Sequence, residues 1–224
     1  MGKSDILDTI PFFSILNENE RTIIMRHMER HTVPRFAMIY HGKHPATEFY
    51  ILTKGSIKTG INCDGREIIR QILHPRMVFG EHALIDGNAL EPYFAMALSP
   101  QTEYYSIKVA PFRQLMDDNP QLAMGVLSLL SLHLRRTEQQ MASLILKDAR
   151  SRIIDFILEH AQLAGRTIGF EVLLKHSLTQ QDIANSTGTS RQTVTAVLND
   201  LRKSNKIYFK RNTILIRDMA GLAT

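Results

Sequence analysis

The stretch that decides the fold of the C-terminal third is SLTQQDIANSTGTSRQTVTAVLNDL, residues 177–201. Thr179 is followed three residues later by Asp182, which is the spacing of a capping box, so a helix is expected to begin near Gln180. Gly188 is expected to end that helix, because glycine readily adopts the backbone conformation that closes one. The stretch therefore predicts a short first helix followed by a tight turn.

A second helix is expected directly after the turn. Thr189, with Gln192 three residues further on, has the spacing to cap it. Apolar residues of both helices are expected to form one shared core: Ile183, Ala184, Val194, Val197, Leu198 and Leu201. Two short helices joined by a glycine-containing turn are typical of a helix-turn-helix, and an ordinary helical hairpin is the alternative.

In a helix-turn-helix, the N-terminal residues of the second helix meet base edges in the major groove of DNA. The residues in that position here all have hydrogen-bonding side chains: Ser190, Arg191, Gln192 and Thr195. Arginine pairs bidentately with guanine, and glutamine suits adenine. We therefore interpret these four residues as base-reading.

Residues 206–217 alternate in polarity and turn at Arg211-Asn212, which predicts a two-stranded wing beside the reading helix. Contacts to DNA phosphates are expected from Thr179, Gln180, Thr189, Lys206, Lys210 and Arg211. Such contacts give affinity but carry no sequence information.

The charge of the chain supports a polyanionic partner. Residues 149–224 hold 11 basic and 6 acidic residues, whereas residues 1–148 hold 16 of each, so the whole net charge of +5 lies in the C-terminal third. A concentrated basic excess is typical of nucleic-acid binding, and a solvated basic surface is the alternative.

Residues 120–147 predict one long helix, with Asn119-Pro120 as its start. One stripe along it repeats in steps of four and three residues: Ala123, Leu127, Leu130, Leu134, Thr137, Met141 and Leu144. Such a heptad seam implies a partner helix, so a homodimer is expected. Val126 and Leu129 fall off the seam and are expected to face the preceding domain; a helix buried only against that domain is the alternative.

Residues 36–110 predict short strands separated by turns. The expected strands are 49–52, 56–61, 67–73, 95–98 and 104–109, with turns at Gly55 and Asp64-Gly65. Strands at this spacing predict a small barrel or sandwich. A helix over 151–164, closed by Gly165, is expected to lead into the DNA-reading region.

The segment Gly188-Thr-Ser-Arg-Gln-Thr-Val, with Leu198 and Leu201 after it, resembles the helix-turn-helix of the Crp/Fnr superfamily of bacterial regulators. Phe79-Gly80-Glu81 and Asp86-Gly87 resemble the effector segment of its barrel, and Asp148 resembles its hinge aspartate. The resemblance spans roughly residues 10–218 and implies an α+β chain. A cyclic-nucleotide-binding-like β jelly roll, a long dimerisation helix and a C-terminal winged helix-turn-helix would follow in that order.

This order predicts three parts: an effector-sensing β-barrel domain (1–118), a dimerisation helix with its hinge (119–148) and a winged-helix DNA-binding domain (149–224). Proteins of this kind are dimers on two-fold symmetric double-stranded DNA. If the protein activates transcription, RNA polymerase is a further expected partner.

The resemblance also implies an effector pocket made of Gly80, Glu81, His82, Glu91, Tyr93, Arg135, Thr137 and Glu138. In the cyclic-AMP branch an Arg-Ser pair holds the cyclic phosphate, whereas Glu91-Pro92 stands at that place here. No arginine occurs from Val78 to Glu103. A small organic effector other than cyclic AMP is therefore expected.

Several alternative kinds of effector or control are also consistent with the sequence. Residues 87–97 resemble the halorespiration regulators, which bind chlorinated aromatic acids. His82 lies close to where the carbon-monoxide-sensing regulators place a haem ligand, so a haem-based gas sensor is one alternative, and a cyclic-nucleotide-dependent regulator is another. Constitutive DNA binding, or redox control through Cys63, would need no ligand.

Composition excludes other classes of protein. The single cysteine, Cys63, rules out disulfides within the chain, cysteine-ligated zinc sites and iron–sulfur clusters. His41 and His44 do not complete the ligand set of a cupin-like metal enzyme, and no nucleophile elbow or phosphate-binding loop occurs, so neither an enzyme nor a metal site is expected. With no membrane-spanning run and no signal peptide, the expected location is cytoplasmic.

Overall fold

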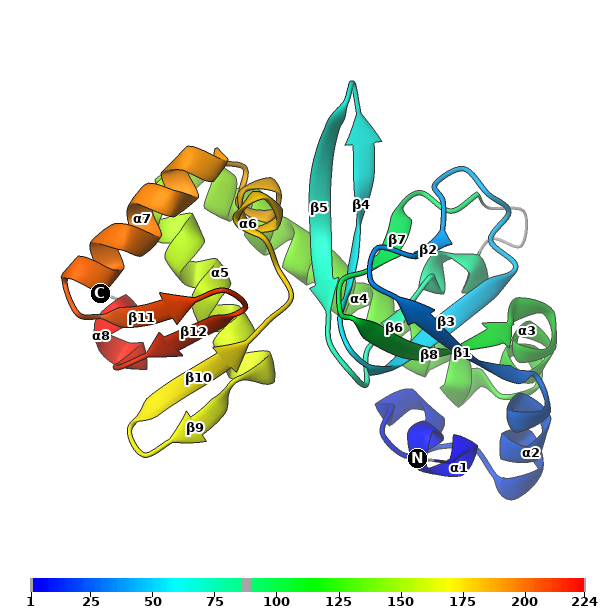
Figure 1. Cartoon of the computed structure of the whole chain (residues 1–224). Helices are drawn as coiled ribbons and strands as arrows, with labels where there is room; N and C mark the ends of the chain where they lie inside the picture. The colour runs from blue at the N-terminus through cyan, green and yellow to red at the C-terminus, as the bar shows by residue number, and fades with distance from the viewer. Residues whose placement is uncertain (1, 86–89, 224) are drawn as a thin grey trace. The chain divides into compact units, whose positions relative to one another are not determined.

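The computed structural model describes residues 2–85 and 90–223 (Figure 1). The chain forms two compact units. The first comprises Met1–Ile61 and Gln71–Thr137, and the second comprises Asn62–Arg70 and Glu138–Thr224.

The first unit begins with the short helices α1 (Lys3–Leu7), η1 (Pro11–Phe13) and α2 (Glu18–Arg26). A reciprocal capping box starts α2, in which Asn17 Oδ1 accepts from the Glu20 amide at 3.0 Å and Glu20 Oε2 accepts from the Asn17 amide at 2.8 Å. The sequence interpretation did not foresee these helices, although the Asn-x-x-Glu pattern is a helix-start signal.

Eight strands then form two four-stranded sheets (Figure 1). One has the order β1-β8-β3-β6 and the other β2-β7-β4-β5. The strands are β1 (Met28–Pro34), β2 (Met38–Tyr40), β3 (Glu48–Lys54), β4 (Ile57–Cys63), β5 (Arg66–Leu73), β6 (Val78–Phe79), β7 (Phe94–Ala97) and β8 (Gln101–Lys108). The five predicted strands are confirmed, whereas β1, β2 and β6 went unpredicted. The last predicted strand was one residue too long, because Val109 begins α3 (Val109–Asp118).

The long helix α4 (Pro120–Leu146) is confirmed nearly residue for residue. Its start is fixed by Asn119, whose Oδ1 accepts from the amides of Gln121 and Leu122 at 3.2 and 3.3 Å. Leu122 and Val126 are fully buried in the core of the first unit, and Leu129 packs against that core as expected.

The predicted seam of α4 is largely exposed in the single chain. Leu127, Leu134, Met141 and Leu144 are each 50–60% exposed. Leu130 differs from them, since it is partly buried against the core of its own unit. A helix with this much exposed apolar surface along one stripe has the pattern of an uncovered interface.

The second unit contains the helices α5 (Ala149–Ala164), α6 (Gln180–Thr187), α7 (Arg191–Lys203) and α8 (Met219–Ala223). Its sheet has the order β11-β12-β10-β9, from β9 (Arg166–Ile168), β10 (Glu171–Lys175), β11 (Ile207–Lys210) and β12 (Thr213–Ile216). The wing turning at Arg211-Asn212 is confirmed as β11 and β12. The strands β9 and β10 and the helix α8 were not predicted.

One capping prediction is wrong: the N-cap of α7 is Ser190, not Thr189. Gly188 takes a left-handed backbone (φ 60°), and the Thr189 amide bonds back to the carbonyl of Ala184 at 3.0 Å, so Thr189 still belongs to the end of α6. Ser190 is then the first residue free to cap, and its Oγ accepts from the Thr193 amide at 3.0 Å.

The left-handed backbone at Gly188 predicts a stability effect. Gly188→Ala should lower the free energy of unfolding by about 1–2 kcal/mol, because a Cβ is disfavoured at this φ. Gly188→Asn should lose less, since asparagine tolerates the conformation better. Urea unfolding of the three proteins measures this, and an alanine variant as stable as the wild type would contradict it.

Candidate DNA-binding interface and effector site

Helices α6 and α7 form the predicted helix-turn-helix. Thr179 Oγ1 accepts from the Asp182 amide at 3.0 Å, and Asp182 Oδ2 accepts from the Thr179 amide at 2.8 Å, so the capping box at the start of α6 is confirmed. The six predicted core residues, Ile183, Ala184, Val194, Val197, Leu198 and Leu201, are all buried. This packing fixes which face of α7 remains on the surface.

The first turn of α7 presents a polar surface. Arg191 and Gln192 are exposed there. Ser190 is also exposed, but its Oγ is engaged in the N-cap. Thr195 is turned toward α6, where its hydroxyl donates to Gln180 Oε1 at 2.6 Å. Of the four residues interpreted as base-reading, Arg191 and Gln192 therefore have side chains most available to a ligand.

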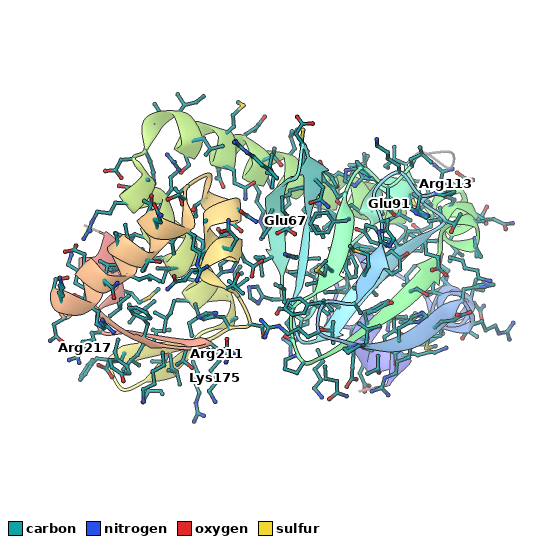
Figure 2. All side chains as sticks on the ribbon, turned by 45° about the horizontal axis from the view of Figure 1, so that its top comes forward. Glu67, Glu91, Arg113, Lys175, Arg211 and Arg217 are labelled. Carbon is teal, nitrogen blue, oxygen red and sulfur yellow. The ribbon has the colours of Figure 1, made fainter. Side chains whose placement is uncertain are left out.

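The residues expected to contact phosphates are spread over α6, the turn and the wing. Lys210 and Arg211 are exposed at the wing tip, whereas the Lys206 ammonium donates to the Gly221 carbonyl at 2.7 Å. Lys175 is the last residue of β10 and Arg217 directly follows β12; both are exposed cations that sequence reasoning did not single out (Figure 2). The position of Lys175 could not be read without β10 and its pairing to β12.

In the barrel, the predicted effector segment begins with a tight turn at Gly80. Gly80 has a left-handed backbone (φ 72°), and a Cβ there would lie 2.9 Å from the ring of Tyr50. The 3-10 helix η2 (Glu81–Leu84) follows directly. Arg113 of α3 holds the end of η2, since its guanidinium donates to the carbonyls of Leu84 and Ile85. Gly80 thus lets the aromatic ring and the acidic turn pack together.

Glu81 is buried and bonded to the long helix. It is 2% exposed, and its Oε1 lies 2.7 Å from Nδ1 of His133 on α4 and 3.4 Å from Nδ1 of His82. Burial alone would raise the pKa of Glu81, but the hydrogen bond and charge of His133 hold that pKa below its ordinary value. The carboxylate of Glu81 is therefore compensated.

Glu91 is buried without such compensation. It is 3% exposed, and within residues 2–85 and 90–223 its Oε1 has no hydrogen-bond partner. Burial, followed by the charge of Glu81, raises the pKa of Glu91 to about 7. Burial raises the pKa of Tyr50, and the charges of Glu48 and then Glu91 add to that rise. The ring of Tyr93 meets that of His82 edge-on, with centroids 5.5 Å apart.

Among the residues of the expected effector pocket, those of the barrel lie near one another, since Glu81 contacts His82 and His82 contacts Tyr93. In the described part of the chain, the three expected residues of the long helix make no hydrogen bond to them. Arg135, Thr137 and Glu138 are exposed on α4. The helix residue that reaches Glu81 is His133, which sequence reasoning missed. The signal was present, because His133 continues the buried stripe of Leu122, Val126 and Leu129 in steps of four, three and four.

Asp148, the predicted hinge residue, is the N-cap of α5. Its Oδ1 accepts from the Ser151 amide at 2.7 Å, and this bond holds the pKa of Asp148 below its ordinary value. Asp86-Gly87, the other part of the effector motif, lies outside the described residues. Cys63 is exposed, and its Sγ lies 3.7 Å from the carboxylate of Asp64.

Within the part of the chain that the structure describes, no three His, Cys, Asp or Glu side chains gather as metal ligands. Likewise, no described helix has both the length and the apolar character to cross a membrane.

Residues 30–119 match the model of the cyclic nucleotide-binding domain, and residues 151–224 match that of the Crp-like helix-turn-helix domain. The chain is 31% identical over 192 residues to a CRP-like cAMP-activated global transcriptional regulator of Mycobacterium tuberculosis, covering 85% of this chain and 84% of that one. It is 30% identical over 194 residues to a global nitrogen regulator of Nostoc, with 86% of each covered.

Solved structures agree in fold. The structure of FixK2 from Bradyrhizobium japonicum superposes with a TM-score of 0.78 at 21% identity, over 87% of this chain and 95% of that one. CooA from Carboxydothermus hydrogenoformans gives a TM-score of 0.71 at 20% identity, over 88% of this chain and 87% of that one.

The fold and its helix-turn-helix thus define a DNA-binding transcription regulator rather than an enzyme. The chain belongs to the Crp/Fnr family, as the resemblance in its sequence predicted.

The uncompensated carboxyl of Glu91 predicts a pH effect on stability. Its pKa is raised in the folded chain, so the folded state binds this proton more tightly than the unfolded state, and stability falls as pH rises toward and past 7. Compared with Glu91→Gln, the wild type should lose about 2 kcal/mol of unfolding free energy between about pH 5 and pH 8. Urea unfolding across this range measures it, and parallel pH profiles for the two proteins would contradict it.

Proposed function

We propose that the protein is a homodimeric, sequence-specific transcription regulator controlled by a small organic effector other than cyclic AMP. The observation that carries the effector part is that Glu91 is buried, and the sequence resemblance aligns Glu91-Pro92 with the pair that holds the cyclic phosphate in the cyclic-AMP branch. A carboxyl beside a phosphate is repulsive, and the unpartnered Oε1 of Glu91 accepts hydrogen bonds when ionised.

Base recognition is assigned to the exposed first turn of α7. Arg191 and Gln192 have the side chains to pair with guanine and adenine, with Ser190 and Thr195 at the edges of the same surface. The cations at the wing tip, Lys210 and Arg211, are assigned to phosphates. The helix-turn-helix family and the basic excess of the C-terminal third support this division.

Dimerisation is assigned to the outer stripe of α4. Four exposed apolar side chains repeat along it at heptad spacing: Leu127, Leu134, Met141 and Leu144. Pairing with the same helix of a second chain would remove this apolar surface from water. Two recognition helices would then face successive major grooves of a two-fold symmetric site.

A haem-bearing regulator remains the second candidate, through the half-exposed His82 near Tyr93. Native mass spectrometry and an absorption spectrum of the purified protein separate the readings. A colourless dimer whose affinity for DNA is unchanged by cyclic AMP is expected; a haem band, or tighter DNA binding with cyclic AMP, would contradict the proposal.

The two classes of DNA contact predict different mutant behaviour. Arg191→Ala should cost about 1–3 kcal/mol on the specific site and relax specificity at one base position. Lys210→Ala should weaken specific and random DNA alike and flatten the salt dependence. Fluorescence anisotropy on both DNAs at several salt concentrations measures this. An Arg191 variant that loses equal affinity for both DNAs would make that residue a phosphate contact.

The seam predicts that one charge would break the dimer. Leu134→Glu should dissociate it, because two carboxylates would be buried against each other across the paired helices. Gln139→Glu places the same charge on the opposite, exposed face of α4 and should leave the dimer intact. Sedimentation velocity distinguishes them, and a stable Leu134→Glu dimer would place the interface elsewhere.

A further inference from the structure

One side chain of α5 ties the end of the long helix to the helix-turn-helix. We propose that Arg152 is a positioning residue, which fixes the recognition helix α7 relative to the end of α4 and thereby sets the half-site spacing that the dimer accepts. This inference rests on the proposed homodimeric reading of DNA and names a residue through which its specificity arises.

Arg152 donates to three backbone carbonyls from two separate segments. Its Nη1 donates to the carbonyl of Lys147, which directly follows α4, at 2.6 Å. Its Nε donates to the carbonyl of Thr187, the last residue of α6, at 2.9 Å, and its Nη2 to that of Gly188 at 3.3 Å. All four residues belong to the second unit, as does the part of α4 from residue 138 onward. One guanidinium therefore joins the end of α4 to the turn of the helix-turn-helix.

The local sequence places Arg152 where it can make these bonds. Asp148 caps α5, and the Arg152 amide donates to the Asp148 carbonyl at 3.1 Å, so Arg152 lies one turn into the helix. Ile153 and Ile157 are buried on α5 and fix its rotation about its own axis. The cap and the buried face together determine the position from which the guanidinium reaches the carbonyls.

The chemistry of the contact favours arginine. The last carbonyls of a helix lack partners within that helix and carry partial negative charge. Arg152 brings its cation to two such ends, that of α4 and that of α6. A guanidinium offers five donors in a fixed plane, whereas a lysine ammonium is a point charge on a flexible stem. Arginine can therefore hold the three carbonyls in one geometry, which lysine cannot do.

The end of α4 also packs closely against the same turn. A Cβ on Gly188 would lie 2.9 Å from Cδ2 of Leu144 on α4. The turn of the helix-turn-helix thus follows the helix end through an apolar contact as well as through hydrogen bonds. Because Leu144 belongs to the stripe assigned to dimerisation, a pair of α4 helices would carry two recognition helices in a fixed orientation.

Two other cations near the hinge make weaker links. Lys147 Nζ lies 2.7 Å from Asp155 Oδ2, and Arg150 Nη1 lies 2.6 Å from Asp200 Oδ2 of α7. These four side chains are 43–57% exposed, and exposed ion pairs contribute little. Arg150 lies in the same turn of α5 as Arg152, carries the same charge and also reaches the helix-turn-helix, so Arg150 provides a matched control.

The test measures how strictly the protein requires one half-site spacing. Duplexes selected by the wild type from a random library supply the symmetric site, and one base pair is then inserted between its half-sites. The insertion moves one half-site by about 3.4 Å along the duplex and about 35° around it. In fluorescence anisotropy, the insertion should weaken wild-type binding at least about tenfold, because the two recognition helices cannot follow it.

Arg152→Gln should lower the cost of the insertion to less than about threefold, because its recognition helices are freer to adjust. Its affinity for random DNA should equal that of the wild type, since Arg152 bonds to protein carbonyls. Arg150→Gln should keep the full spacing preference. An Arg152→Gln protein with the wild-type preference, or with equal losses on every DNA, would overturn the proposal.

Arg152→Lys tests the same idea if the glutamine variant does not fold. It keeps the charge at the two helix ends but not the planar set of donors. It should unfold in urea as the wild type does and still lose spacing preference. A lysine variant with the full preference would show that charge alone suffices, which would overturn the role given to the three hydrogen bonds.

The wild type separates this inference from the proposed function. If it binds a single half-site as tightly as the symmetric site, the proposed paired reading fails and the inference fails with it. If it prefers one spacing and the Arg152 variants keep that preference, only the role of Arg152 fails.

Discussion

The long helix α4 has two apolar stripes on different sides, and both must be removed from water; the architecture depends on that constraint. The inner stripe of α4 buries Leu122 and Val126 in the core of the first unit. Its outer stripe leaves Leu134 and Met141 about 60% exposed. Burying one stripe cannot bury the other, because they lie on different sides of the same helix. A regulator that dimerises through this helix uses both, one for its own domain and one for its partner.

The inner stripe ends in the hydrogen bond between Glu81 and His133, which connects η2 to α4. Because both partners are buried, a change in the charge or position of either is costly unless the other follows. A ligand bound beside Glu81 would therefore bias the position of the helix that carries the proposed dimer interface. Such a ligand can shift an equilibrium only by the difference between its affinities for two states. Burial and, after it, the same carboxylate charge raise the pKa of Glu91, so the two buried carboxyls share one electrostatic environment.

Local patterns were sufficient to predict much of this from sequence. The capping box of α6, the glycine that closes it, the heptad stripe of α4 and the wing turn each depend on residues a few positions apart. Pairings between distant segments were not accessible in this way: β10 pairs with β12 some 40 positions further on, and this pairing joins the β9–β10 and β11–β12 hairpins into one sheet. The N-cap of α7 was misplaced by one residue, because the left-handed Gly188 keeps Thr189 in the end of α6. In the expected effector site, Glu81 and Glu91 were named from a resemblance. That both are buried, with the pKa of Glu81 lowered and the pKa of Glu91 raised, follows only from the folded barrel.

We propose that two copies of this chain read DNA together through paired α4 helices. The most direct test is selection of bound sequences from a random duplex library, followed by sequencing and by mass measurement of the complex. We expect two-fold symmetric sequences with half-site centres about 10 base pairs apart, each duplex carrying two chains. Enrichment of single, non-symmetric sites carrying one chain would contradict it.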